Sequence, residues 1–280
     1  MPPRTGAIRV PFQPAPVTLR WYEWGPADGR PVVCVHGLTR SGRDFDALAQ
    51  ALAADGRRVI CPDVPGRGIS DWFADGTQYG VPYYVAVLAP MLAALGEYDW
   101  VGTSMGGLIA MGVAAMPDNR MRRLVLNDVG PFIPKASLDR IGAYLALDQV
   151  FASFAALEAH LRFIHAPFGA LSDVEWRHLA TTSARVTADG RWRLHYDPAI
   201  GDPLRGGVEA DMDLWPMWEA VAARPVLLLR GALSDLLLPE VAARMAEAPS
   251  VRLETIPGCG HAPALMNAHQ TGLIADFLRG

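Results

Sequence analysis

The chain has 280 residues, a formal net charge of −4 and a hydrophobic fraction of 51%. This length is enough for one large core with an insertion, and the small charge without a run of Lys or Arg argues against a nucleic acid or an anionic membrane as partner. No apolar stretch is long enough to span a membrane, and residues 1–16 do not resemble a signal peptide. The odd cysteine count favours free thiols, so we expect a cytoplasmic protein; the cysteines are Cys34, Cys61 and Cys259.

Strands and helices are predicted to alternate along most of the chain. After a proline-rich arm or edge at residues 1–16, strands are predicted at 17–25, 31–37, 57–66, 99–104 and 122–130, with helices at 42–56, 81–96 and 105–118. The pattern resumes late in the chain, with strands at 225–231 and 251–258 and helices at 239–247 and 263–278. Short links between alternating elements are typical of a mostly parallel sheet covered on both faces, so the fold class is α/β.

Residues 131–218 interrupt this alternation. They are helical in spacing, rich in aromatic side chains and without a convincing buried strand. We therefore predict a core domain of residues 1–130 and 219–280 and a cap domain of residues 131–218. The aromatic side chains could form the cap's own small core or line an apolar pocket, and the sequence leaves both open. Trp215 and Trp218, together with Arg40 in the core, are candidate substrate contacts.

Ser104 lies in the stretch "VGTSMGG", between a predicted strand and a predicted helix. The pattern G-x-S-x-G at such a junction is typical of a nucleophilic serine on a strained turn. Side chains two residues before and after the serine would collide there, which explains Gly102 and Gly106. The start of the helix favours negative charge that develops near the hydroxyl.

A serine hydroxyl needs a base, and the base needs an orienting carboxylate. His261, in the loop "GCGHAP" between the last strand and the last helix, is the candidate base. Asp235 follows the strand at 225–231 and gives the chain order Ser, Asp, His, so it is the predicted carboxylate. Asp128, at the end of the preceding strand, is the rival. Cys259 beside His261 is a further, less favoured nucleophile.

Two backbone N–H groups are predicted to hold an oxyanion: that of Met105 at the start of the helix and that of Leu38 in the loop after the strand at 31–37. His36 is expected to hold this loop by hydrogen bonds rather than to transfer protons. Asp63, with Gly66 and Gly68 in "DVPGRGISD", is expected to shape a turn. Nothing in the sequence indicates a metal or nucleotide cofactor, since histidine–carboxylate spacing and the G-x-G-x-x-G pattern are missing.

These motifs together resemble the α/β-hydrolase family. The stretches are "HG" at 36–37, "DVPGRGISD" at 63–71, "GTSMGG" at 102–107, "RGALSD" at 230–235 and "GCGHAP" at 258–263. The resemblance implies a mostly parallel eight-stranded sheet flanked by helices, with a mainly helical cap inserted after strand 6. It also implies a serine hydrolase with the triad Ser104, Asp235 and His261, acting on carboxylic esters through an acyl-enzyme.

Several other activities remain open on the same residues. Haloalkane dehalogenases and epoxide hydrolases resemble this fold but carry an aspartate where Ser104 stands, which argues against both. A carbon–carbon bond hydrolase, a lactonase and a cofactor-free perhydrolase are alternatives, and a small-molecule receptor is the alternative that is not an enzyme. The predicted partner is a small-molecule ester with apolar groups. The sequence does not predict the oligomeric state.

Overall fold

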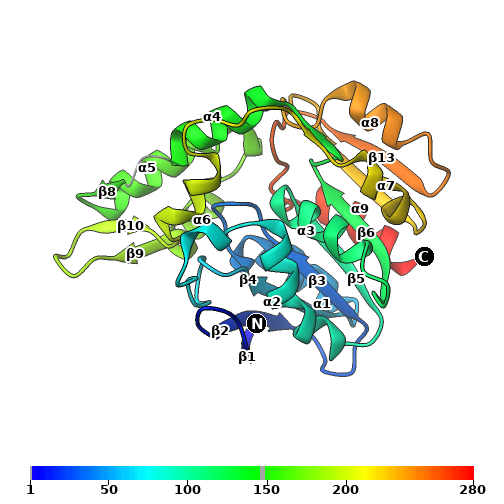
Figure 1. Cartoon of the computed structure of the whole chain (residues 1–280), viewed down its shortest axis with the longest axis horizontal. Helices are drawn as coiled ribbons and strands as arrows, with labels where there is room; N and C mark the ends of the chain where they lie inside the picture. Colours follow the sequence, from blue (N-terminus) through cyan, green and yellow to red (C-terminus); the bar gives the residue numbers. More distant parts are fainter. Residues whose placement is uncertain (1, 146–148) are drawn as a thin grey trace.

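The computed structural model describes residues 2–145 and 149–280, and its centre is an eight-stranded sheet (Figure 1). The strand order is β1-β2-β4-β3-β5-β6-β12-β13. Neighbouring strands are parallel except at β1–β2 and β2–β4, so the predicted fold class is confirmed. The strands are β1 (Arg4–Val10), β2 (Val17–Trp24), β3 (Pro31–Val35), β4 (Arg58–Asp63), β5 (Tyr98–Thr103), β6 (Met121–Asn127), β12 (Val226–Gly231) and β13 (Val251–Ile256).

The central strands are buried on both faces, which is why they read as continuous apolar runs. In β3, Val33 and Val35 belong to one hydrophobic cluster, whereas Val32 and Cys34 belong to the other. The first cluster includes residues of α2 (Val81–Ala93), α3 (Met105–Ala114), α7 (Trp215–Ala222) and α8 (Pro239–Met245). The second includes residues of α1 (Asp46–Ala54) and α9 (Ala268–Arg279). The helix expected at 42–56 begins with a separate 3-10 turn at Gly42–Phe45.

The segment between β6 and β12 is mainly helical and lies across one end of the sheet (Figure 1). It contains α4 (Lys135–Leu145), α5 (Phe154–Ile164), α6 (Asp173–Ser183) and the 3-10 helix η4 (Pro198–Leu204), and ends in α7. It also contains five short strands, β7 (Phe132–Ile133), β8 (Val150–Phe151), β9 (Ala184–Val186), β10 (Trp192–Leu194) and β11 (Met212–Asp213), none of them fully buried. Residues 146–148 of the predicted cap lie outside the described part.

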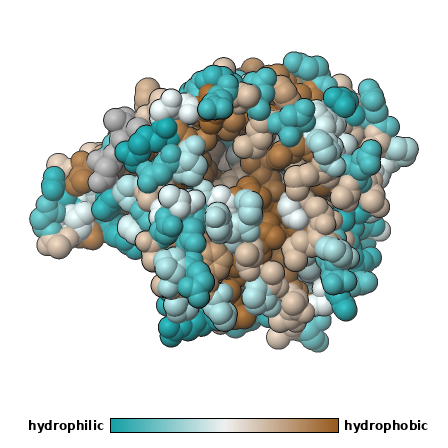
Figure 2. Space-filling model, viewed as in Figure 1, coloured by the Kyte–Doolittle hydropathy of each residue, from teal (hydrophilic) through white to brown (hydrophobic). Residues whose placement is uncertain are grey.

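Part of this segment has a core of its own. Leu157 and Leu161 of α5 pack with Ala180 of α6, and three aromatic side chains pack against them: Phe151, Phe154 and Trp192. These aromatic residues therefore support the segment itself. Other apolar side chains gather around a hollow beside α4 on the face shown in Figure 2. Within the described ranges, no helix is both long and apolar enough to cross a membrane.

Candidate active site

Ser104 stands at the turn from β5 into α3 in a strained backbone conformation. Its φ is 52° and its ψ is −116°, values that few residues other than glycine adopt. A Cβ atom on Gly102 would lie 2.5 Å from the carbonyl oxygen of Gly106, and one on Gly106 would overlap the carbonyl oxygen of Val35. The two glycines are therefore required by close backbone contacts, as the sequence predicts.

His261 lies in the loop between β13 and α9 and contacts both a hydroxyl and a carboxylate. Its Nε2 atom is 2.9 Å from the Ser104 hydroxyl, and its Nδ1 atom is 2.7 Å from Oδ2 of Asp128. With the proton on Nδ1, the ring donates to Asp128 and accepts from Ser104. A hydroxyl, an imidazole and a carboxylate are thus connected in a line, an arrangement that could support nucleophilic catalysis.

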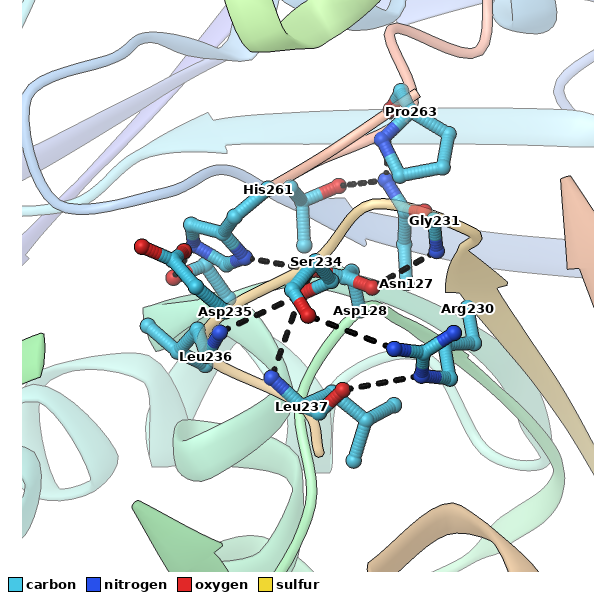
Figure 3. A network of polar contacts seen from close by, with 12 residues as sticks. Asn127, Asp128, Arg230, Gly231, Ser234, Asp235, Leu236, Leu237, His261 and Pro263 are labelled. Carbon is cyan, nitrogen blue, oxygen red and sulfur yellow. Dashed lines mark hydrogen bonds and ion pairs between the residues drawn. The ribbon is translucent and has the colours of Figure 1, made fainter. Parts of the chain in front are cut away.

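Asp128 directly follows β6 and is fully buried. Besides His261, its carboxylate accepts hydrogen bonds from the Gly231 N–H at 2.7 Å and from the Ser234 hydroxyl at 2.6 Å. Figure 3 shows these contacts meeting between the end of β12 and the His261 loop. A buried carboxylate is costly unless it is hydrogen-bonded, and three donors meet that need here.

No hydrogen bond or ion pair joins Asp235 to His261, so the predicted orienting carboxylate is corrected: the carboxylate that pairs with His261 is that of Asp128. The Asp235 side chain is 60% exposed and forms an ion pair with Arg140 at 2.8 Å. The reason is the fold of the loop after β12. There the Ser234 side chain points inward, where its oxygen accepts from the N–H groups of Leu236 and Leu237. The side chain of the following residue, Asp235, therefore points outward.

The predicted oxyanion donors, Leu38 and Met105, both line the cavity that holds Ser104. Neither N–H donates a backbone hydrogen bond within the described part of the chain. Arg67 contacts both residues: its Nε donates to the Leu38 carbonyl at 2.8 Å, and its Nη2 lies 3.6 Å from Sδ of Met105. The two N–H groups are therefore available for an oxyanion, and one buried guanidinium supports both of their residues.

His36 and Asp63 hold the surrounding loops, as predicted. His36 accepts the Val64 N–H at 3.0 Å and contacts the Gly37 carbonyl at 2.7 Å, while burial lowers its pKa to about 3 and keeps it neutral. Asp63 accepts from the N–H groups of Gly42 and Ile69. Burial raises the pKa of Asp63 to about 7 although these hydrogen bonds oppose the shift.

Ser104 and His261 open into a cavity of about 290 Å³ between the core and the segment from β6 to β12. Arg40 lines this cavity, as expected of a substrate contact. Trp215 and Trp218 do not line it, so their predicted substrate contacts are corrected: Trp218 is buried in the first hydrophobic cluster, and Trp215 packs edge-on against it. The apolar wall comes from other residues of the segment, among them Ile133, Leu138, Ile141, Ile164, Phe168, Ile200, Leu204 and Met212.

Two further residues near the site differ in what they can contribute. His165 lines the cavity, and burial holds its pKa well below the usual range. Its position follows from the end of α5, which nothing in the local sequence relates to Ser104. Cys259 is buried against the Phe168 carbonyl, and burial raises the pKa of its thiol. A thiol with a raised pKa is a poor nucleophile, which disfavours Cys259.

Comparisons with known proteins agree with this architecture. Residues 30–268 match the family model described as the alpha/beta hydrolase fold. The chain is 43% identical to a 3-hydroxybutyrate-oligomer hydrolase of Cupriavidus necator, over 99% of this chain and 98% of that protein. A crystal structure of an alpha/beta hydrolase from Novosphingobium aromaticivorans is 34% identical with a TM-score of 0.89, covering 99% and 98% of the two chains. The structure of E-2-(acetamidomethylene)succinate hydrolase is 26% identical with a TM-score of 0.84, covering 99% and 100%.

Proposed function

Because the chain belongs to the α/β-hydrolase fold family, we propose that it is a serine hydrolase that cleaves carboxylic esters through an acyl-enzyme. The observation that carries the proposal is the pair of hydrogen bonds at His261, 2.9 Å to Ser104 and 2.7 Å to Asp128. A hydroxyl, an imidazole and a buried carboxylate in this order form the constellation that activates a serine for acyl transfer.

In the proposed reaction, the Ser104 oxygen attacks the ester carbonyl while His261 takes the hydroxyl proton. The N–H groups of Leu38 and Met105 stabilise the negative oxygen of the tetrahedral intermediate. His261 then gives the proton to the leaving alcohol, and Asp128 stabilises the charged imidazole in between. Water repeats the sequence on the acyl-enzyme and releases the acid, so Ser104 and His261 return to their starting states.

For the substrate, we propose short linear oligoesters of small hydroxy acids, with a 3-hydroxybutyrate oligomer as the first choice. The relative from Cupriavidus necator, similar over 99% of this chain, supports this class. The cavity of about 290 Å³ with a mostly apolar wall suits small acyl and alcohol groups. We further propose a cytoplasmic location, in keeping with three cysteines that are free thiols in the structure.

The nucleophile is tested by labelling the purified protein with a fluorophosphonate probe. We expect the wild type to be labelled and the Ser104→Ala variant to remain unlabelled. A wild type that takes no label, while a known serine esterase in the same assay does, contradicts the proposal. The Ser234→Ala variant should still be labelled at Ser104, because Ser234 lies in the same polar network but does not line the cavity.

The reaction class is tested with one substrate panel: p-nitrophenyl butyrate, 3-hydroxybutyrate dimers and trimers, a lactone, and a carbon–carbon bond substrate. We expect hydrolysis of the esters, with the oligomers giving the highest kcat/KM, and loss of activity in Ser104→Ala. Faster turnover of the lactone or of the carbon–carbon substrate would replace the proposed substrate class. Ligand binding without turnover of any compound would favour a receptor.

A further inference from the structure

The ionisable side chains around the cavity include two arginines and no carboxylate among its described lining residues. The arginines are Arg40 and Arg140, although the chain as a whole has a net charge of −4. Burial and the nearby Arg40 hold the pKa of His165 well below its usual range, so this lining histidine stays neutral. The fixed charges on the wall are therefore positive, which favours a negatively charged group in the cavity.

The two arginines differ in how firmly they are already bound. The Arg40 side chain is 5% exposed, and its Nε and Nη2 atoms donate to the two oxygens of Asp44 at 2.7 and 2.8 Å. Arg140 is 52% exposed, and its partner Asp235 is 60% exposed. An ion pair so open to water contributes only about 0–1 kcal/mol, so the Arg140 guanidinium can exchange Asp235 for another carboxylate.

The loop that carries Asp235 does not depend on this ion pair for its position. Ser137, three residues before Arg140 on α4, donates its hydroxyl to the Asp235 carbonyl oxygen at 2.8 Å. Leu236, the next residue, lines the cavity. The backbone of the loop is thus fixed against α4 while the Asp235 carboxylate stays free to leave Arg140.

From this arrangement we propose that Arg140 binds the free carboxylate of the substrate, and that Asp235 competes with the substrate for it. The inference deepens the proposed function and depends on it for the scissile bond. When a linear hydroxy-acid oligomer is hydrolysed, the fragment that leaves as the alcohol carries the carboxyl end. Arg140 therefore holds the leaving fragment, and the substrate class narrows to oligoesters with an unblocked carboxyl end.

The test measures binding separately from turnover, in the Ser104→Ala background, by calorimetry. The ligands are the 3-hydroxybutyrate dimer as free acid and as methyl ester. We expect the free acid to bind about fivefold more tightly, a preference of the size that one exposed charge pair provides. Adding Arg140→Ala should remove the preference, adding Asp235→Asn should increase it, and added salt should reduce it.

The matched control is Arg252→Ala. Arg252 is 51% exposed and paired with Glu254 on β13, so it resembles Arg140 in exposure but does not line the cavity. This variant should keep the acid preference of its parent. Equal affinity for acid and methyl ester, an Arg140→Ala variant that keeps the preference, or an Asp235→Asn variant that weakens it would overturn the inference.

A dicarboxylic acid half-ester offers the same chemistry from another source. Monomethyl and dimethyl adipate are therefore measured as a second acid–ester pair. A preference that appears only for the adipate pair would overturn the assignment to an oligoester end. Hydrolysis of the hydroxybutyrate dimer by the wild type is measured in parallel, so failure of the proposed function shows as absent turnover, independently of the binding preference.

Discussion

Two aspartates near the site have opposite surroundings, and these surroundings decide what each can do. Asp128 is fully buried, with hydrogen bonds from Gly231, Ser234 and His261. Such a carboxylate is held in one geometry and can fix the tautomer of the histidine that it contacts. Asp235 faces water and an arginine, where it affects charge but not the orientation of His261.

We expect Asp128→Asn to lower kcat for p-nitrophenyl butyrate by about 10³–10⁴-fold. The asparagine oxygen can accept the Gly231 N–H, which turns its amide N–H₂ toward His261. Nδ1 of His261 must then accept, so the ring proton moves to Nε2, which can no longer take the proton of Ser104. Steady-state kinetics measures the loss, and far-UV circular dichroism with a thermal melt checks the fold.

The control is Asp235→Asn, assayed on the same uncharged ester. Because Asp235 lies outside the hydrogen-bonded line, its effect should be at most a few-fold. If Asp235→Asn lost more activity than Asp128→Asn, the orienting carboxylate would have to be reassigned. The Asn exchange is preferable to Ala in both cases because it keeps the side-chain volume.

The sequence could predict Ser104 and His261 but not the choice of aspartate, for a physical reason. Asp128 and Asp235 follow β6 and β12, which are neighbouring parallel strands, so both residues lie near the same edge of the sheet. Chain order alone cannot separate them. The choice depends on how the loop after β12 folds, and there Arg230 donates to the carbonyl groups of Leu237 and Ser234. These contacts depend on the three-dimensional structure of the loop, and a sequence motif does not predict them.

At the scale of elements, the sheet and its helices could be predicted because the hydrophobic pattern that indicates each of them lies within a short stretch of sequence. Residues of β3 alternate between the two hydrophobic clusters, α3 begins at the predicted Met105, and α1 ends within two residues of its predicted limit. The prediction that Trp215 and Trp218 of α7 contact the substrate is wrong because an apolar helix face can pack against a core as well as line a pocket. Trp218 packs into the core, and the guanidinium of Arg244 lies 3.7 Å from the ring centre of Trp215.

Arg67 links the elements that carry the proposed oxyanion donors. It comes from the turn after β4, and it contacts the loop after β3 through Leu38 and α3 through Met105. Its side chain is fully buried, and no ion pair with a carboxylate is found for it in residues 2–145 and 149–280. A buried guanidinium held only by uncharged acceptors and tyrosine rings leaves positive charge beneath the site.

We therefore expect Arg67→Met to lower kcat by about 10–100-fold with a much smaller change in KM. The hydrogen bond to the Leu38 carbonyl and the buried charge are lost, and both act chiefly on the tetrahedral intermediate. A boronic acid, which mimics that intermediate, should lose affinity in parallel with kcat, while the product acid should not. Arg67→Lys should recover part of the effect through its charge. A change in KM alone, with unaltered boronate affinity, would show a packing role instead.

At the scale of the whole molecule, the segment from β6 to β12 is joined to the core by polar contacts near the cavity. The Gly68 N–H donates to Nδ1 of His195 at 2.7 Å, and the Tyr79 hydroxyl donates to Asp197 at 2.6 Å. The Asp197 N–H donates in turn to the Gly66 carbonyl at 2.8 Å. These contacts join the segment from β6 to β12 to the turn that carries Arg67. Because Arg67 also contacts Leu38, this segment and the loop after β3 form one structural unit.

The contact at His195 should make stability depend on pH. His195 is buried, and burial together with the nearby charge of Arg40 holds its pKa well below 6.5. The unfolded chain protonates this histidine below pH 6.5 but the folded protein does not, so its contribution is complete above pH 6.5 and falls as the pH decreases. His195→Asn keeps an acceptor for the Gly68 N–H and removes the titration.

We expect the free energy of unfolding to fall less in His195→Asn than in the wild type when the pH is lowered from 7.5 to 5.5, with a difference of about 1 kcal/mol. Urea unfolding at several pH values measures both proteins. Asp63, whose raised pKa of about 7 acts in the opposite direction, is present in both and cancels in the comparison. If the free energies of unfolding of the two proteins changed in parallel with pH, His195 would have to become protonated in the folded protein. The contact between the segment from β6 to β12 and the core would then survive this charge.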